Sequence, residues 1–309
     1  MTIATNVLDS IGNTPLVALR RIVPLGHARV LVKLEGGNPT GNMKDRMAKA
    51  AIEAAEADGR LMAGGTVVEY TGGSTGASLA LVCAAKGYKL KIITSDAFSE
   101  EKTRTMKAFG AEIRLIASDN KRITEELVRR MIDAARQVSR APGHWWFDQL
   151  NNPDGAKGYH QMGEEIWAET GGKVHAFVQS VGSAHSLNGV SDVLRRHNPG
   201  LHVAAAEPAE SAVLSGKPKG AHRIEGIGIG FIPPQWRPDD VNEIVSATTD
   251  EAAHMCRRLA REEGIFAGTS SGLNVIAALR IAERLGPEAT VVTVIIDSGL
   301  RYLSTDVYR

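Results

Sequence analysis

Residues 66–87 read TVVEYTGGSTGASLALVCAAKG and contain the pattern that decides the predicted fold. The β-branched run TVVEY predicts a short buried strand, and the glycine-rich turn TGGSTG follows it. The apolar segment at 77–87 predicts a buried helix that ends near Gly87. A strand, a small-residue turn and a helix in this order are typical of parallel sheets covered on both faces.

The same alternation continues along the chain in both directions. Further strands are predicted at 30–35, 89–95, 111–118, 175–181, 202–207 and 289–296. Helices are predicted after the turns NPTGN (38–42) and GSAHS (182–186), and at 99–110, 123–140, 158–170, 250–264 and 273–286. The break in the pattern near 140–150 predicts two α/β units rather than one sheet.

Composition excludes several classes of protein. The chain has 309 residues, 43% hydrophobic and 23% charged, with a net charge of +1, so we expect neither a nucleic-acid partner nor an acidic membrane surface. No apolar run is long enough for a transmembrane helix, and the first residues do not resemble a signal peptide. Two distant cysteines without CxxC spacing predict a reduced, cytoplasmic protein. The histidines lack metal-ligand spacing, so no metal site is expected.

Three small-residue turns precede helices: TGGSTG (71–76), GSAHS (182–186) and GTSSG (268–272). Such turns present backbone N–H groups to carboxylates or phosphates. One such turn is weak evidence, because tight turns of this kind occur in any α/β fold, but three that all carry hydroxyls favour ligand binding. None matches the phosphate loop GxxxxGK[ST], and GIGIG (226–230) is not the dinucleotide fingerprint GxGxxG.

Lys44 stands at the predicted start of a helix, in GGNPTGNMKDRMAKA (36–50). A helix N-terminus disfavours positive charge, and partial burial by Met43 and Met47 acts in the same direction, so we expect a lowered pKa. A lowered pKa suits an amine that acts as nucleophile or base. From spacing alone, however, an ordinary surface lysine on a charged helix is the favoured interpretation.

Seven stretches of the chain, in order and spacing, resemble the cysteine synthase and cystathionine beta-synthase family of fold-type II pyridoxal phosphate (PLP) enzymes. They are IGNTPLV (11–17), KLEGGNPTGNMKDR (33–46), TGGSTGAS (71–78), DQLNNP (148–153), IEGIGIGF (224–231), AGTSSG (267–272) and VVTVIIDSGLRYLST (291–305). The resemblance runs from Ile11 to Thr305.

The resemblance implies an architecture. It is an α/β fold of two doubly wound three-layer αβα domains with PLP in the cleft, like the tryptophan synthase beta subunit. Residues 37–145 would form a smaller, mobile α/β domain that carries the substrate-carboxylate loop. Residues 1–36 plus 146–309 would form the larger, cofactor-binding domain, and the protein would be a homodimer.

The resemblance also implies residue roles. Lys44 matches the lysine that carries the cofactor covalently and then removes the substrate Cα proton. Loop 182–186 matches the phosphate-binding loop, and Ser270 matches the serine that hydrogen-bonds the pyridine nitrogen. The implied cofactor-binding residues are Lys44, Ser74, Gly182, Ser183, Ala184, His185, Ser186 and Ser270. The implied substrate-binding residues are Thr71, Gly72, Gly73, Thr75, Gln149 and Gly226, the last in a loop that lines the cofactor in relatives.

The sequence departs from the family pattern in two turns. The usual TSGNTG is TGGSTG here, so Gly72 replaces a serine, and Ser74 replaces an asparagine that bonds the 3′-oxygen of the cofactor. Ser74 is shorter and would reach that oxygen only through water. The usual GTGGT contains Ala184 and His185 in place of two glycines. His185 either adds a donor to the phosphate or faces outward.

The resemblance implies PLP-dependent β-replacement on an O-activated L-serine, such as O-acetylserine, with sulfide or another small nucleophile. This is the cysteine synthase reaction of cysteine biosynthesis. The alternative is β-elimination, as in a cysteine desulfhydrase or a serine/threonine dehydratase. A non-catalytic binding protein and a nucleotide-dependent oxidoreductase are disfavoured, because Lys44 and Ser270 are retained and the dinucleotide fingerprint is absent. The leaving group and the nucleophile stay open.

Overall fold

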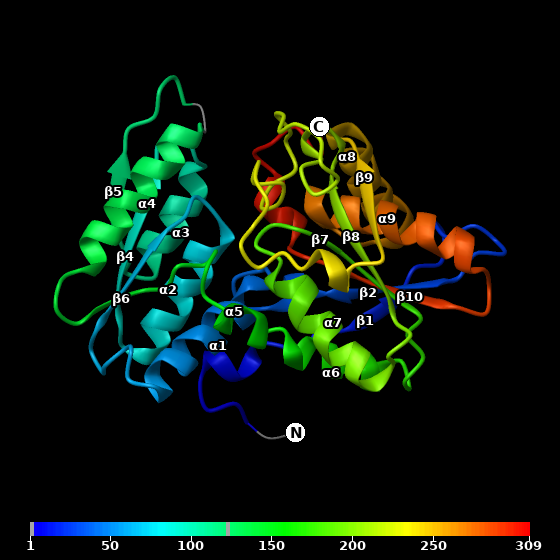
Figure 1. Ribbon diagram of the computed structural model, residues 1–309, viewed down its shortest axis with the longest axis horizontal. Coiled ribbons are helices and arrows are strands. Elements are labelled where there is room, and N and C mark those ends of the chain that lie inside the picture. Colours follow the sequence, from blue (N-terminus) through cyan, green and yellow to red (C-terminus); the bar gives the residue numbers. More distant parts are fainter. Residues whose placement is uncertain (1–2, 122–123) are drawn as a thin grey trace. The chain divides into compact units, whose positions relative to one another are not determined.

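The computed structural model describes residues 3–121 and 124–309 (Figure 1). The chain forms two compact units. The first contains Lys44–Gly158 together with the chain up to Ile11, and the second contains Gly12–Met43 and Tyr159–Arg309. Each unit has its own sheet, as the break in the sequence pattern predicts.

The units change at residues 44 and 158, whereas the domain boundaries expected from the sequence lie near 37 and 145. Backbone hydrogen bonds explain the first difference. The Met43 N–H donates to the Ile296 carbonyl at 3.0 Å, and the Ser298 N–H donates to the Gly41 carbonyl at 2.9 Å, which keeps the turn NPTGN with the second unit. The second difference arises because Gly158 lies against the backbone of Arg46, where an added Cβ would be 2.5 Å from the Arg46 carbonyl oxygen.

The first unit has a four-stranded parallel sheet in the order β5-β4-β3-β6. Its strands are β3 (Thr66–Tyr70), β4 (Lys89–Ser95), β5 (Glu112–Ile116) and β6 (His144–Trp146). Its helices are α1 (Lys44–Ala57), α2 (Ser74–Lys86), α3 (Glu100–Ala108), α4 (Glu125–Ser139) and α5 (Asp154–Lys157). The expected start of α4 at residue 123 lies outside the described residues.

Strand β3 is the centre of this unit, and all five of its residues are buried. Val68 and Tyr70 pack with Leu127 and Met131 of α4. Because side chains alternate across a strand, Val67 points to the opposite face, and α2 contacts β3 and β4. The sheet is therefore covered on both faces, as the apolar strands predict.

The second unit has a six-stranded sheet in the order β1-β2-β10-β7-β8-β9. Its strands are β1 (Leu16–Ala18), β2 (Arg29–Leu34), β7 (Ala176–Ser180), β8 (His202–Pro208), β9 (Glu243–Ala247) and β10 (Thr290–Ile295). Its helices are α6 (His160–Glu169), α7 (His185–His197), α8 (Thr249–Arg258) and α9 (Thr269–Leu285). Helices α8 and α9 lie on one side of this sheet, and α6 and α7 lie on the other (Figure 1).

The central strand β10 is buried along its whole length between β2 and β7, as its uninterrupted apolar sequence predicts. The pairing is parallel, as predicted, except at one edge, where the short strand β1 runs antiparallel to β2. The long helix predicted at 250–264 is α8 followed by a π-helical turn at Leu259–Glu263. In the described part of the chain, no helix is both long enough and apolar enough to cross a membrane.

Candidate active site

Loop 71–76 contains the turn after β3 and the first three residues of α2 in the first unit. The Thr71 N–H donates to the Ile93 carbonyl at 3.0 Å, and the Gly73 N–H donates to the Thr71 hydroxyl at 3.2 Å. The N-cap residue Gly73 makes no side-chain cap for α2. A helix N-terminus without a side-chain cap is the kind of helix end that binds carboxylates in proteins.

Gln149 joins this loop although it is 74 positions from Thr75 in the sequence. The Thr75 hydroxyl donates to Gln149 Oε1 at 2.8 Å, so the structure brings together two of the predicted substrate residues. The Gln149 N–H donates at 3.2 Å to Oε2 of Glu69, which is buried in β3. Burial raises the pKa of the Glu69 carboxyl well above its usual value.

Glu69 was not among the predicted site residues. The signal available in the sequence was an acidic residue inside the otherwise apolar strand TVVEY. Its Oε1 accepts the N–H of Tyr70 at 2.9 Å while Oε2 accepts the N–H of Gln149, so this carboxyl fixes the backbone that carries Gln149. Asp148, directly before Gln149, has a φ of 49°, which shows how sharply the chain turns there.

Lys44 is the first residue of α1, as predicted. It is half-buried, and its neighbours Met43 and Met47 are 4% and 1% exposed. Asp45 and Arg46 are also buried. These neighbours argue against the interpretation of Lys44 as an ordinary solvent-exposed lysine on a charged helix.

In the second unit, loop 182–186 contains the turn after β7 and the first two residues of α7. Ala184 occupies the N-cap position with a φ of 70°, in the left-handed region, and makes no side-chain cap. His185 is only 2% exposed, and its Nδ1 lies 3.0 Å from the Ser183 hydroxyl. The alternative in which His185 faces outward is therefore wrong, and its ring belongs to the loop.

Two further segments contact this loop. An added Cβ on Gly182 would lie 2.5 Å from the Gly226 carbonyl oxygen, so the chain at Gly226 passes directly over the turn. The adjoining Glu225 N–H donates at 3.3 Å to the hydroxyl of Thr269, the first residue of α9. Ser270, in the first turn of α9, is 2% exposed. Loop 182–186, Gly226 and Ser270 therefore belong to one connected set of segments.

Helix α9 is fixed to the sheet by side chains that the sequence did not single out. Asn274 accepts the Ser180 N–H at 2.7 Å and donates to the Val294 carbonyl at 2.8 Å. The Ser271 hydroxyl accepts the Ile296 N–H at 2.9 Å. These bonds join the first turns of α9 to the ends of β7 and β10 and so determine where Ser270 lies.

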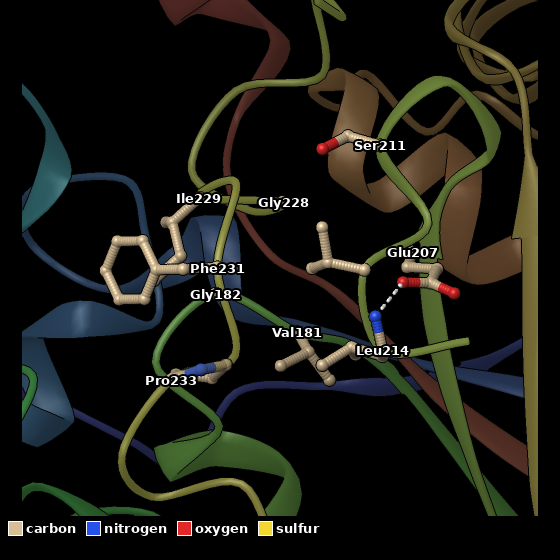
Figure 2. Close-up of a pocket in the computed structure, with 10 residues that line it drawn as sticks. Val181, Gly182, Glu207, Ser211, Leu214, Gly228, Ile229, Phe231 and Pro233 are labelled. Atoms are coloured by element: carbon tan, nitrogen blue, oxygen red, sulfur yellow. Dashed lines mark hydrogen bonds between the residues drawn. The ribbon is translucent and has the colours of Figure 1, made fainter. Parts of the chain in front are cut away.

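A small pocket lies beside Gly182 (Figure 2). Glu207 on its wall accepts the Leu214 N–H at 2.8 Å, and the buried Ser211 hydroxyl has no hydrogen-bond partner among the described residues. Its volume of about 10 Å³ suits one water at most. The residues that line it are Val181, Gly182, Glu207, Ser211, Val213, Leu214, Gly228, Ile229, Phe231 and Pro233.

Comparison with known proteins identifies the family. The sequence profile of the family described as "Pyridoxal-phosphate dependent enzyme" matches residues 7–297. The chain belongs to this family. It is an α/β PLP-dependent enzyme of the fold-type II class, as the resemblance implies. Among the described residues of this PLP enzyme, no group of three or more His, Cys, Asp or Glu side chains is placed to hold a metal ion.

Individual relatives support the same assignment for this PLP enzyme. It is 41% identical over 306 residues to a cysteine synthase of Staphylococcus aureus, covering 98% of this chain and 96% of that protein. The crystal structure of cysteine synthase from Entamoeba histolytica matches with a TM-score of 0.92 and 37% identity, covering 99% of this chain and 91% of that chain. A hydrogen sulfide-producing enzyme from Fusobacterium nucleatum matches with a TM-score of 0.89 and 33% identity, covering 98% and 99%.

The residues of the site fit the chemical groups of PLP. Loop 182–186 lies at the N-terminus of α7, a helix without a side-chain cap from Ala184, and such a helix end binds phosphate. The buried Ser270 offers a neutral hydroxyl, which is able to hydrogen-bond a pyridine nitrogen. Lys44 offers an amine at a helix start. Loop 182–186, Ser270 and Lys44 therefore fit the cofactor.

Proposed function

We propose that this enzyme catalyses β-replacement on an O-activated L-serine such as O-acetylserine, with sulfide or another small nucleophile. The observation that carries the proposal is the presence of Lys44, loop 71–76 and Ser270 in a chain that is 41% identical to a cysteine synthase. When bound, PLP withdraws electrons from the substrate Cα and makes its proton acidic.

In the first unit, loop 71–76 and Gln149 hold the substrate carboxylate. The hydrogen bond from Thr75 to Gln149 ties the two together before the substrate arrives. This preorganisation reduces the entropy that binding must remove. The Lys44 amine takes the Cα proton, the leaving group departs from Cβ, the nucleophile adds to Cβ, and Lys44 returns the proton to Cα.

In the second unit, loop 182–186 and the N-terminus of α7 hold the cofactor phosphate. The Ser270 hydroxyl hydrogen-bonds the pyridine nitrogen. A hydroxyl is not an acid of the strength that would protonate this nitrogen, so the electron withdrawal by the cofactor stays limited. Limited electron withdrawal favours β-elimination and β-replacement over transamination.

Covalent trapping tests the proposed role of Lys44. Purified protein is expected to be yellow, and borohydride is expected to fix the cofactor to the peptide that contains Lys44. Lys44→Ala should abolish both the trapping and the formation of cysteine from O-acetylserine and sulfide. Lys49→Ala, on the same helix, is the matched control and should keep both. A Lys44→Ala protein with full turnover contradicts the mechanism.

A second candidate reaction is β-elimination, as in a cysteine desulfhydrase or a serine/threonine dehydratase. The solved relative that is described as a hydrogen sulfide-producing enzyme favours it. The same residues would remove the Cα proton, and the leaving group would not be replaced. Release of pyruvate and sulfide from cysteine, compared with cysteine formation from O-acetylserine at equal enzyme concentration, separates the two reactions.

The proposal also includes a location in the cell and an oligomeric state. We propose a cytoplasmic homodimer, supported by two free, buried cysteines and by the family resemblance. We also propose that the first unit, which contains most of the domain expected at 37–145, is the mobile one and carries the carboxylate loop. Light scattering of the purified protein tests the dimer, and crystals with and without an amino-acid ligand test the movement.

A further inference from the structure

Two neighbouring loops follow the parallel strands β3 and β4 at one edge of the four-stranded sheet. Tyr70 at the end of β3 pairs with Ile93 of β4, so the chain after each strand continues at the same edge, where ligands of α/β folds bind. The loop after β3 is 71–76. The loop after β4 is a tight turn in which the Phe98 N–H donates to the Ser95 carbonyl at 3.2 Å.

This second turn is anchored. Asp96 Oδ1 accepts the Ser118 N–H at 2.8 Å, which joins the turn to the chain beyond β5. The Ser95 hydroxyl accepts the Ala97 N–H at 3.3 Å. Phe98 is therefore carried on a turn that is held at both sides, and its half-buried ring packs against the cluster that includes Tyr70 and Leu127.

The ring of Phe98 occupies the position that a side chain at residue 72 would take. A Cβ added to Gly72 would lie 2.0 to 2.3 Å from three ring carbons of Phe98, a distance at which the ring must move. At Gly76 an added Cβ would lie 2.4 Å from the Met106 sulfur of α3. At Gly73, by contrast, an added Cβ would meet nothing within 4 Å. Contact with the segment 96–108 is thus confined to two of the three glycines in the loop.

We propose that Phe98 is a specificity-determining residue for the amino-acid substrate. Its ring forms a fixed apolar wall beside the substrate-carboxylate loop and excludes substrates with a bulky substituent on Cβ. This inference rests on the proposed function, in which loop 71–76 holds the substrate carboxylate. Gly72 is then the residue that allows the ring to lie against the loop, so the two positions act as a pair.

Removal of the ring tests the proposal in the holoenzyme. Initial rates of cysteine formation with sulfide give the KM of O-acetyl-L-serine and the inhibition constant of O-benzyl-L-serine, an ether with a poorer leaving group. In Phe98→Ala the phenyl group of the benzyl ligand replaces the missing ring. The preference for O-acetyl-L-serine over O-benzyl-L-serine is therefore expected to fall roughly tenfold or more. Phe109→Ala removes a 37% exposed phenylalanine next to α3 and should leave the preference unchanged.

The reciprocal variant tests the pairing. Gly72→Ala inserts a methyl group into the ring position and is expected to weaken O-acetyl-L-serine binding roughly tenfold. In the double variant Gly72→Ala/Phe98→Ala the methyl group has room, so most of this loss should be recovered. Thermal denaturation should show the same pattern, with a Tm for the double variant above that of Gly72→Ala. Phe98→Leu serves if Phe98→Ala does not fold.

The outcomes separate this inference from the proposed function. If the wild-type enzyme binds neither ligand and forms no cysteine, the proposed function fails and this inference fails with it. If the wild type binds O-acetyl-L-serine but Phe98→Ala keeps the ligand preference of Phe109→Ala, only the inference is overturned. Loss of binding in the double variant equal to the sum of the two single losses also overturns it, because independent positions add.

Discussion

Ala184 shows how a single residue can hold a backbone that its side chain disfavours. Its φ of 70° lies in the left-handed region, where a residue with a Cβ costs about 1–2 kcal/mol relative to glycine. The family pattern places glycine here, so the departure changes the side chain and keeps the glycine-like backbone. The backbone at this turn therefore has a conformation that glycine allows, although the sequence has alanine where the family pattern has glycine.

We predict that Ala184→Gly keeps cofactor binding and changes the free energy of unfolding by less than about 1 kcal/mol. The relief of backbone strain is offset by the greater entropy of glycine in the unfolded chain. Ala184→Val adds a branched side chain at the same φ and should lower stability by about 2 kcal/mol or more. Urea denaturation and the absorbance of bound cofactor measure both effects. Equal stability of the two variants would contradict this account.

The buried carboxyl of Glu69 leads to a prediction about how folding stability depends on pH. Its pKa is raised from a usual value of 4.5 by burial, so the folded protein keeps a proton that the unfolded chain releases. The stability that this proton linkage contributes is fully present below about pH 4.5 and is lost as the pH rises toward the raised pKa. Glu69→Gln does not titrate. The stability deficit of Glu69→Gln relative to wild type should therefore shrink as the pH rises from about 4.5 toward neutrality.

Denaturant titrations at several pH values measure this difference. Glu112→Gln replaces a 71% exposed carboxylate on β5 in the same sheet and is the matched control. It should show a smaller change with pH, because solvent screens an exposed group. If the stability deficit of Glu69→Gln relative to wild type stays constant with pH, burial does not govern the titration of Glu69.

At the level of single residues, the sequence could predict the three turns, because turns of small residues have local signatures. The roles of Lys44 and Ser270 came from the family resemblance and stay predictions. The sequence could not predict the contact of Phe98 with Gly72. That contact depends on the pairing of β3 with β4, which brings two loops together. The position of His185 was also open, because burial of a loop side chain depends on segments that are distant in the sequence.

At the level of elements, the segment after β10 determines the position of the chain before α9. The Tyr308 hydroxyl donates to the Ala267 carbonyl and accepts the Ala267 N–H at 3.2 Å. Its ring lies 4.5 Å from that of Phe266, and the Tyr302 hydroxyl donates to Asp297 at 2.8 Å. These contacts hold the short stretch that leads into Ser270.

We predict that Tyr308→Phe lowers the free energy of unfolding by about 1–2 kcal/mol, because both hydrogen bonds to Ala267 are lost in a partly buried place. The cofactor absorbance maximum should shift if the stretch before Ser270 also moves. Tyr88→Phe removes the bond between a tyrosine hydroxyl and Glu56 in the other unit and is the control. A wild-type spectrum together with wild-type stability would show that the hydroxyl of Tyr308 has no positioning role.

The longer, buried strands could be predicted from the sequence, and the shortest strands could not. Strands β3 and β4 have the predicted bounds, because both are rich in β-branched residues and are followed by clear turns. Strands β1, β6 and β9 were not predicted. The first two have three residues each, which is too short for an alternation to be read, and β9 follows an irregular stretch. Their place in the sheets comes from pairing with longer neighbours, which the local sequence does not encode.

At the level of the whole molecule, two separately packed units carry different parts of the proposed cofactor chemistry. Lys44 and loop 71–76 belong to the first unit, and loop 182–186 and Ser270 belong to the second. The break in the strand–helix pattern near residues 140–150 predicted two units. The position of the boundary at Met43 and Lys44 depends on backbone bonds to the chain after β10, which no local pattern reveals.

The four tryptophans allow the units to be observed separately, since Trp145 and Trp146 lie in the first and Trp167 and Trp236 in the second. Without cofactor, we expect the shorter first unit to unfold at the lower denaturant concentration, because a shorter chain buries a smaller fraction of its surface. Paired Trp→Phe variants, each of which keeps the tryptophans of one unit, resolve the two transitions by fluorescence.

Added PLP should raise the stability of whichever unit holds it, by about 2.7 kcal/mol at a concentration one hundred times its Kd. If Lys44 and loop 182–186 both bind the cofactor, both transitions should move to higher denaturant. In Lys44→Ala the transition of the first unit should move less, while phosphate binding by loop 182–186 still raises that of the second. A cofactor effect confined to one unit in the wild type would show that the residues assigned in the other unit do not bind it.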